Sequence, residues 1–184
     1  MSTLSRHLLT AEEFATLPFG DMRYELVRGE IVTMPPAFED HGESSSRFEI
    51  LLGHYILMNN LGKTYTAETG FLVGRDPDTV RAPDFAFIQR DRLPGSVPAP
   101  RWVPVMPDLV VEVVSSGDRP AEIADKVRMW LDAGVRMALV VTPGARAIDV
   151  HRPGQPLRTP RDGDTLDGGD VLPGFSAPVS HLLG

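Results

Sequence analysis

The fold of this chain depends on the stretch Pro107-Asp108-Leu109-Val110-Val111-Glu112-Val113-Val114-Ser115. Five of the seven residues at 108–114 are branched aliphatics and a polar segment follows them, so the pattern predicts a short buried strand. Strands this apolar are usually covered on both faces, as at the centre of an α/β sheet. Glu112 is the exception, because a buried ionised carboxylate is destabilising unless it is paired or holds a metal ion. The strand alone allows two explanations for Glu112: a structural ion pair with an arginine, or a functional site.

The composition limits the class of protein. A chain of 184 residues predicts a single domain, residues 1–184, with a sizeable core. The absence of cysteine excludes disulfides, thiolate metal sites and a cysteine nucleophile, and it fits a cytoplasmic protein. The first residues lack the apolar core of a signal peptide, and no stretch is long and apolar enough to span a membrane, so no membrane contact is expected.

The charge is acidic overall but unevenly distributed. A net charge of −7 argues against a large non-specific surface for nucleic acid. Only two of the eighteen basic residues are lysines, Lys63 and Lys126, which makes each lysine a candidate for a chemical role. The arginines form two clusters that would allow a local basic face: Arg81, Arg90, Arg92 and Arg101, then Arg146, Arg152, Arg158 and Arg161.

The order of the predicted elements indicates a mixed α/β protein. The run from Thr10 to Glu13 is a capping box, and Arg28-Gly29 separates two strand-like runs as in a hairpin. Asp118 is the expected N-cap of a later helix that ends at Gly134. The predicted helices are 10–17, 41–61 and 119–133; the predicted strands are 23–27, 30–34, 64–68, 71–74, 81–88, 108–114, 136–142 and 147–151, with a loop at 89–106 and an edge segment at 170–175.

Two acids and a lysine are expected to share one pocket. Asp84 lies at the start of one predicted strand, Glu112 lies inside the next, and Lys126 lies on the helix that follows. Two carboxylates on adjacent strands would repel each other unless a cation lay between them, and oxygen ligands select Mg²⁺ or Mn²⁺. We expect the Val113 carbonyl to be a further ligand. Such an ion can polarise a phosphate and activate water, while the lysine deprotonates that water or stabilises the developing charge.

Short pieces of sequence occur in a recognisable order: Tyr24-Glu-Leu-Val-Arg-Gly-Glu-Ile31, His41-Gly42, Ala82-Pro83-Asp84, Val111-Glu-Val-Val-Ser115, Lys126 and Asp132-Ala-Gly-Val135. In this order they resemble the Uma-type family of putative restriction endonucleases, within the restriction endonuclease-like PD-(D/E)xK superfamily. The resemblance runs from about Tyr24 to Arg152.

The resemblance implies a restriction endonuclease-like α/β fold, with a mixed central sheet, flanking helices and an N-terminal β-hairpin extension. Asp84 and Glu112 would be the metal ligands, Lys126 the catalytic lysine, and Glu25 a further acidic catalytic position that acts through a water. The implied activity is a metal-dependent nuclease, with Mg²⁺ or Mn²⁺ as cofactor, that hydrolyses phosphodiester bonds in DNA by attack of a metal-bound water. Cutting two strands with one site per domain would favour a homodimer.

The chain departs from the superfamily's core motif in the position of its lysine, as the Uma-type pattern does, and from the Uma-type pattern at two other places. The core motif has its lysine two residues after the acid, where this chain has Val114, so the lysine would have migrated to Lys126. Trp130 stands in place of a usual tyrosine, and Ala138-Leu139 in place of a usual Tyr-Trp pair. We interpret these replacements as core substitutions.

Each candidate residue also has a purely structural interpretation. Asp84 could cap the turn after Pro83, and Lys126 could pair with Glu122 on a solvated helix face. His41, directly before a predicted helix, is interpreted as a cap or surface residue.

Glu25 has a structural alternative of its own, which is exposure to solvent or an ion pair with Arg23 or Arg28. At the level of function, the alternative is a catalytically inactive nuclease-fold module that binds nucleic acid or protein. The acidic net charge favours the module, whereas the set of two acids and a lysine favours catalysis.

Overall fold

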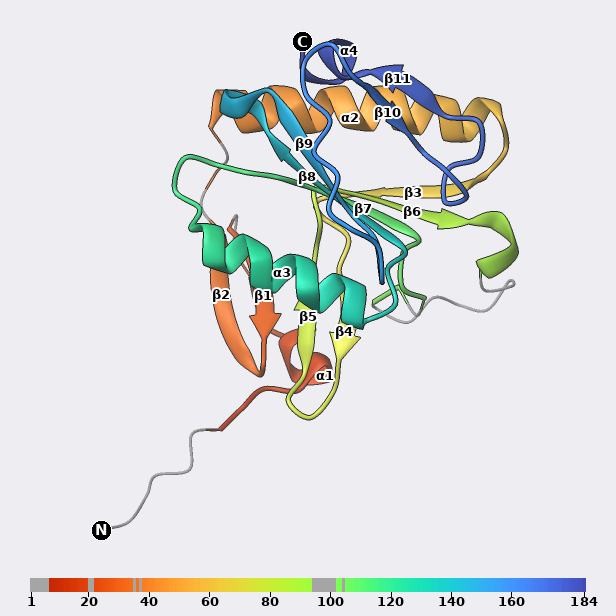
Figure 1. Ribbon diagram of the computed structural model, residues 1–184. Helices are drawn as coiled ribbons and strands as arrows, with labels where there is room; N and C mark the ends of the chain where they lie inside the picture. Colours follow the sequence, from red (N-terminus) through yellow and green to blue (C-terminus); the bar gives the residue numbers. More distant parts are fainter. Residues whose placement is uncertain (1–6, 20–21, 35, 37, 94–101, 104) are drawn as a thin grey trace.

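The stretch around Glu112 forms β7 (Leu109–Val113), the middle strand of a five-stranded sheet with the order β3-β6-β7-β8-β9 (Figure 1). The computed structural model describes residues 7–19, 22–34, 36, 38–93, 102–103 and 105–184. β7 runs parallel to β8 and antiparallel to β6, so the central sheet is mixed, as predicted. All its residues are buried, which confirms the prediction of an internal strand.

The other elements follow the predicted order with shifted ends. The predicted helix 41–61 and strand 64–68 both lie slightly later in the chain than the elements they match. The helices are α1 (Ala11–Phe14), α2 (Glu39–Met58), α3 (Pro120–Asp132) and α4 (Val179–Leu183), with single 3-10 turns η1 (Arg90–Arg92) and η2 (Pro143–Ala145). The remaining strands are β1 (Arg23–Val27), β2 (Glu30–Met34), β3 (Gly62–Thr66), β4 (Phe71–Gly74), β5 (Thr79–Arg81), β6 (Phe85–Gln89), β8 (Met137–Thr142), β9 (Ala147–His151), β10 (Thr165–Asp167) and β11 (Ser176–Pro178).

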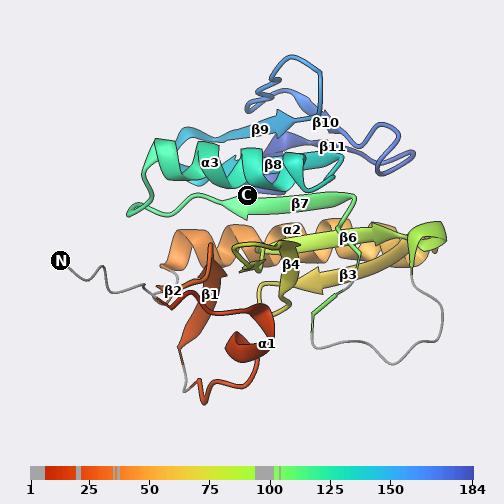
Figure 2. The same ribbon diagram turned by 90° about the horizontal axis from the view of Figure 1, so that it is seen from below.

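Helices cover both faces of the central sheet. α2 packs on one face and α3 on the other (Figures 1 and 2). Because successive side chains of a strand alternate in direction, Val111 and Val113 of β7 join the cluster under α2, whereas Val110 joins the cluster under α3. Glu112 has the same parity as Val110, so its carboxylate is directed towards α3.

The predicted N-terminal hairpin is present, and β5 and β4 extend it into a second sheet with the order β2-β1-β5-β4. The prediction of one strand over 81–88 is wrong, because β5 ends at Arg81 in this second sheet and β6 begins at Phe85 in the central sheet. The chain passes between the sheets at Ala82-Pro83-Asp84, where the proline has no N–H with which to continue a ladder. This crossing places the hairpin beside the carboxyl end of β7.

The two ends of α3 differ in how well they were predicted. Asp118 is not the N-cap: Arg119 occupies that position without a side-chain cap hydrogen bond. The Asp118 carboxylate instead accepts a hydrogen bond of 2.7 Å from the Ser115 N–H and closes the turn after β7. Gly134 follows the helix with φ of +101°, the left-handed conformation that glycine adopts readily, as predicted. The capping box of α1 at Thr10 is also confirmed.

The predicted edge segment at 170–175 forms no strand. A Pro-Gly turn with Gly174 at φ +76° interrupts it, and Val171, Leu172 and Phe175 are buried in the cluster under α2. The nearby strands β10 and β11 pair only with each other, as a separate two-stranded sheet. The segment therefore contributes to the core through its side chains rather than through backbone pairing.

Four of the eight clustered arginines form ion pairs with acidic side chains. Within the described residues the pairs are Arg81–Glu25, Arg92–Asp108, Arg146–Asp162 and Arg152–Asp170. The positive charge of these four arginines is thus offset by neighbouring acids, which leaves less of the expected basic face. In the predicted loop 89–106, residues 94–101 and 104, with Arg101 among them, lie outside the described residues. No helix in the described part of the chain combines the length and the apolarity needed to cross a membrane.

Candidate active site

The Glu112 carboxylate is buried between β7 and α3 and holds two partners. Its Oε2 accepts a hydrogen bond from Lys126 Nζ at 2.6 Å, and its Oε1 accepts one from Trp130 Nε1 at 2.7 Å. Lys126 and Trp130 are four residues apart, so they lie on the same face of α3. The partner of Glu112 is therefore a lysine rather than an arginine, and Lys126 does not pair with Glu122 in solvent.

Asp84 lies in the crossing between the sheets and reaches the neighbouring strand. The β6–β7 register pairs Phe85 with Val111, and its continuation places Asp84 opposite Glu112. The Oδ2 atom of Asp84 accepts a hydrogen bond from the Val113 N–H at 2.8 Å. Asp84 thus does not cap its own turn, and the two carboxylates line one pocket.

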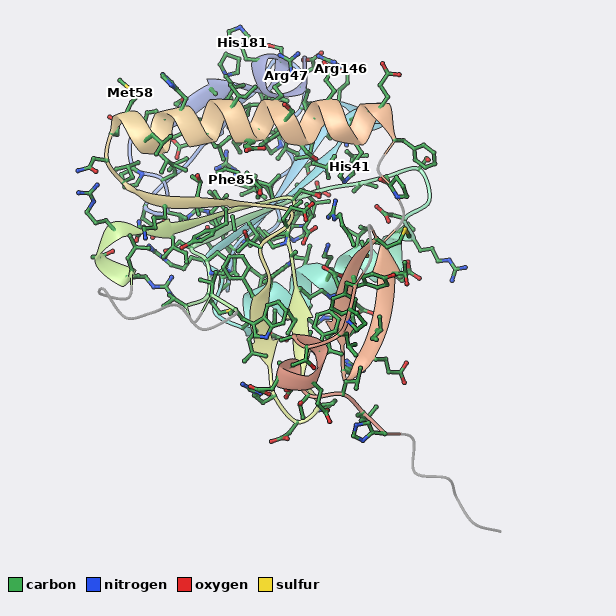
Figure 3. The ribbon with its side chains drawn as sticks, turned by 180° about the vertical axis from the view of Figure 1, so that it is seen from behind. His41, Arg47, Met58, Phe85, Arg146 and His181 are labelled. Carbon is green, nitrogen blue, oxygen red and sulfur yellow. The ribbon has the colours of Figure 1, made fainter. Side chains whose placement is uncertain are left out.

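His41 is the second partner of Asp84. It lies in the first turns of α2, with its Nε2 atom 3.2 Å from Asp84 Oδ2, and only 12% of its side chain is exposed. Figure 3 shows His41 on the side of α2 that faces the sheet, whereas Arg47 lies on the outer side. The interpretation of His41 as a cap or surface residue is therefore wrong.

Glu25 is buried at the edge of this region. Its Oε2 accepts a hydrogen bond from Arg81 Nη1 at 2.8 Å, and its Oε1 accepts one from the Ala82 N–H at 3.1 Å. The structural alternative expected Glu25 to be exposed to solvent or paired with Arg23 or Arg28. It is neither, so that alternative is wrong. Its action as a further acidic group through a water stays a prediction.

The charges of the site act on one another. Burial, opposed by the Lys126 charge and reinforced by the Asp84 charge, raises the pKa of Glu112 to about 7. Burial alone would lower the pKa of Lys126, but Glu112, Glu25 and Asp84 outweigh it and raise that pKa above its ordinary value. The hydrogen bond to Asp84 raises the pKa of His41. Burial would raise the pKa of Asp84, yet His41 holds it below its ordinary value.

These side chains surround a pocket of about 480 Å³. The hairpin, the amino end of α2, the crossing between the sheets, the carboxyl end of β7 and α3 all contribute to its walls. Asp84, Glu112, Val113 and Lys126 line this pocket, as does His41, whereas the Glu25 side chain lines the adjoining cavity. The structure thus brings together four of the five residues proposed from sequence.

Sequence reasoning missed the parts played by His41 and Trp130. The i, i+4 spacing of Lys126 and Trp130 could have indicated that the indole shares the pocket-facing side of α3. No local signal indicates that His41 meets Asp84, because that contact depends on how α2 packs on the sheet.

The donor atoms of the pocket fit a divalent cation. Asp84 Oδ1 accepts no hydrogen bond from the described residues, and Pro83 offers no N–H to the Val113 carbonyl. A carboxylate has about four lone-pair positions, so Glu112 can bind a cation and keep the hydrogen bond from Trp130. Among the described residues no three His, Asp or Glu side chains form a metal-binding group. Two carboxylates and one carbonyl still suit Mg²⁺, which usually keeps several waters.

Replacing Trp130 with phenylalanine is expected to lower the free energy of unfolding by about 1–3 kcal/mol, because Glu112 Oε1 loses its donor inside the core. Urea denaturation of both proteins measures the change. Trp102→Phe is the matched control, since Trp102 is only partly buried and its Nε1–H donates a longer bond, 3.3 Å, to the Ala11 carbonyl. Equal stability of the Trp130→Phe and wild-type proteins would contradict the prediction.

The comparisons with known proteins identify the fold and the family of the chain. The crystal structure of a putative nuclease belonging to DUF820 from Anabaena variabilis superposes with a TM-score of 0.82 and 17% sequence identity, covering 95% of this chain and 97% of that one. No curated protein matches the chain. The family model Uma2, described as putative restriction endonuclease, matches residues 11–180. This chain therefore belongs to the Uma2 family of putative restriction endonucleases.

Proposed function

We propose that this chain is a metal-dependent nuclease that hydrolyses phosphodiester bonds in DNA. The observation that carries the proposal is the meeting of Asp84, Glu112 and Lys126 in one pocket. An acid–lysine pair buried between the central strand and α3 is poorly explained by stability alone, because apolar residues of similar volume are often as stabilising or more so. Membership of the Uma2 family supports a nuclease.

The residues of the pocket have complementary roles in this proposal. Asp84, Glu112 and the Val113 carbonyl would hold Mg²⁺ or Mn²⁺. When bound, the ion supplies a Lewis acid that polarises the phosphate and lowers the pKa of water. The Lys126 ammonium stabilises the negative charge that increases on the phosphate in the transition state. His41 keeps the Asp84 carboxylate in position.

A catalytically inactive binding module is the alternative. It is favoured by the net charge of −7 and by the arginines already paired with acids in the described residues. If the chain does cut both strands of a duplex, one site per chain favours a symmetric homodimer, which sedimentation would detect.

Supercoiled plasmid provides the direct test. We expect the wild-type protein to nick it with Mg²⁺ or Mn²⁺ and not with EDTA, and Asp84→Asn to reduce turnover on the order of a hundredfold or more. Asp125→Asn is the matched control, because Asp125 lies on α3 with 73% of its side chain exposed. If the wild-type protein cuts neither plasmid nor single-stranded DNA with either ion, the inactive module is the better description.

A further inference from the structure

A second cavity, of about 570 Å³, adjoins the pocket that holds Asp84, Glu112 and Lys126, which we call the catalytic pocket after its proposed function. It lies on the side of the N-terminal sheet. Its volume lies within the roughly 300–1,000 Å³ of cavities that enclose small ligands. We call it the aromatic cavity, because four of the residues that line it are Phe14, Phe19, Tyr24 and Trp102. Its lining includes residues of α1, β1 and β5, the elements that pack together at the second sheet. In Figure 1, α1 lies far from α2.

The four rings form a continuous series. Trp102 stacks on Phe14 with centroids 5.7 Å apart, Phe14 meets Phe19 at 4.8 Å, and Phe19 stacks on Tyr24 at 4.6 Å. Phe14 belongs to the core, since it is only 2% exposed. Phe19 is 36% exposed and Met22 is 42% exposed, so both present apolar surface at the cavity. Packing among the described residues leaves this apolar surface exposed.

The aromatic cavity and the catalytic pocket share a wall. Five residues line both spaces: Arg23, Met34, Pro36, Arg81 and Ala82. Arg81 donates to Glu25 through Nη1, and no described residue accepts a hydrogen bond from its Nη2. A ligand that extends from one space into the other therefore passes a cation at the boundary.

We propose that the aromatic cavity binds the base of an unpaired nucleotide whose phosphate lies in the catalytic pocket. The inference rests on the proposed nuclease function and names its substrate class, a single strand or a nucleotide extruded from a duplex. Aromatic side chains stack on the faces of bases, which are accessible only when the base has left the duplex stack. Arg23 and Glu68, which also line the cavity, supply a donor and an acceptor for the polar edge of a base.

A binding experiment separates the base from the phosphates. A short fluorescein-labelled oligothymidylate is compared with a strand of the same length that carries abasic sugars, in EDTA so that neither is cut. We expect the thymidylate to bind more tightly, on the order of tenfold, as for one base stacked on aromatic side chains. Equal affinity for the two strands, or no measurable binding of the thymidylate, would overturn the inference.

Replacing the rings identifies where the base binds. Phe19→Leu combined with Tyr24→Leu keeps apolar volume but removes the stacking faces, so it should abolish the preference for thymidylate and leave affinity for the abasic strand unchanged. Leu57→Ala, which alters an exposed apolar residue of α2, is the control and should retain the preference. Equal loss of affinity for both strands would mean that the rings act only in folding, and the inference would fail.

A second readout does not depend on the double variant. Trp102 lines the aromatic cavity, whereas the other tryptophan, Trp130, is fully buried. Thymidine monophosphate should therefore quench the tryptophan fluorescence of the wild-type protein, and the quenching should be lost in Trp102→Phe and reduced in Phe19→Leu. Quenching that persists in Trp102→Phe, or its absence in the wild type, would count against the inference.

The two proposals fail in different ways. If thymidylate is preferred through the rings but no DNA is cut in Mg²⁺, the base site stands and the nuclease does not. If plasmid is nicked but thymidylate and abasic strands bind alike, the nuclease stands and the base site does not.

Discussion

The double variant Asp84→Asn, Glu112→Gln is expected to lose Mn²⁺ binding and, with it, all detectable cleavage. Asparagine and glutamine keep the size of the two side chains, and their amide oxygens can still accept hydrogen bonds from the Val113 N–H and from Trp130. The substitutions remove the negative charge of the two proposed carboxylate ligands and leave only the Val113 carbonyl unchanged. Isothermal titration with Mn²⁺ measures the binding directly.

The control for this experiment is Asp125→Asn, which removes an exposed carboxylate from α3 and should leave Mn²⁺ affinity unchanged. Thermal melting of the double variant shows whether it is folded. Binding of Mn²⁺ to a folded double variant with wild-type affinity would show that the ion, if it acts at all, is held elsewhere.

Lys126→Met is expected to reduce cleavage on the order of a hundredfold or more, while Mn²⁺ binding survives. Methionine preserves the apolar stem of the side chain but removes the ammonium 2.6 Å from Glu112. The charge proposed to face the phosphate is lost, whereas the proposed oxygen ligands remain. Turnover on plasmid DNA, measured beside Mn²⁺ titration, checks both parts.

The effect of Lys126→Met on the stability of the protein must be measured separately from its effect on cleavage. Breaking a buried ion pair by removing one partner destabilises by as much as about 3–5 kcal/mol, because Glu112 loses its cation. Adding Glu112→Gln to Lys126→Met removes the unpaired charge and should restore much of the stability, but no activity. Arg128→Met is the surface control, since Arg128 is 69% exposed on the same helix. Full turnover in a folded Lys126→Met protein would refute the role assigned to the lysine.

The proposed nuclease activity and the proposed base site together specify how one nucleotide of the substrate would bind. The pocket proposed as catalytic lies where the chain crosses from the second sheet to the central sheet, and the aromatic cavity lies on the other side of Arg81. One nucleotide could occupy both spaces. A chain with a net charge of −7 would then depend on base stacking as well as on phosphate contacts for its affinity.

Much of the fold was predictable because its signals are local. The apolar run at 108–114 indicated an internal strand, the capping box at Thr10 indicated a helix start, and Gly134 indicated a helix end. These features depend on residues within a few positions of one another. The prediction of one strand over 81–88 was wrong because it also used only local signals. A proline inside an apolar run does not indicate that the two halves join different sheets.

By itself, the sequence determined the central strand, the presence of a carboxylate in it, and the set of acids and lysine that could meet there. Only the tertiary structure decided which groups satisfy those charges. His41 reaches Asp84 because α2 packs across the sheet, Trp130 reaches Glu112 because α3 covers the opposite face, and the aromatic cavity forms because α1 packs on the second sheet. Each of these contacts joins residues on different elements, and its distance depends on packing, which no local pattern of residues encodes.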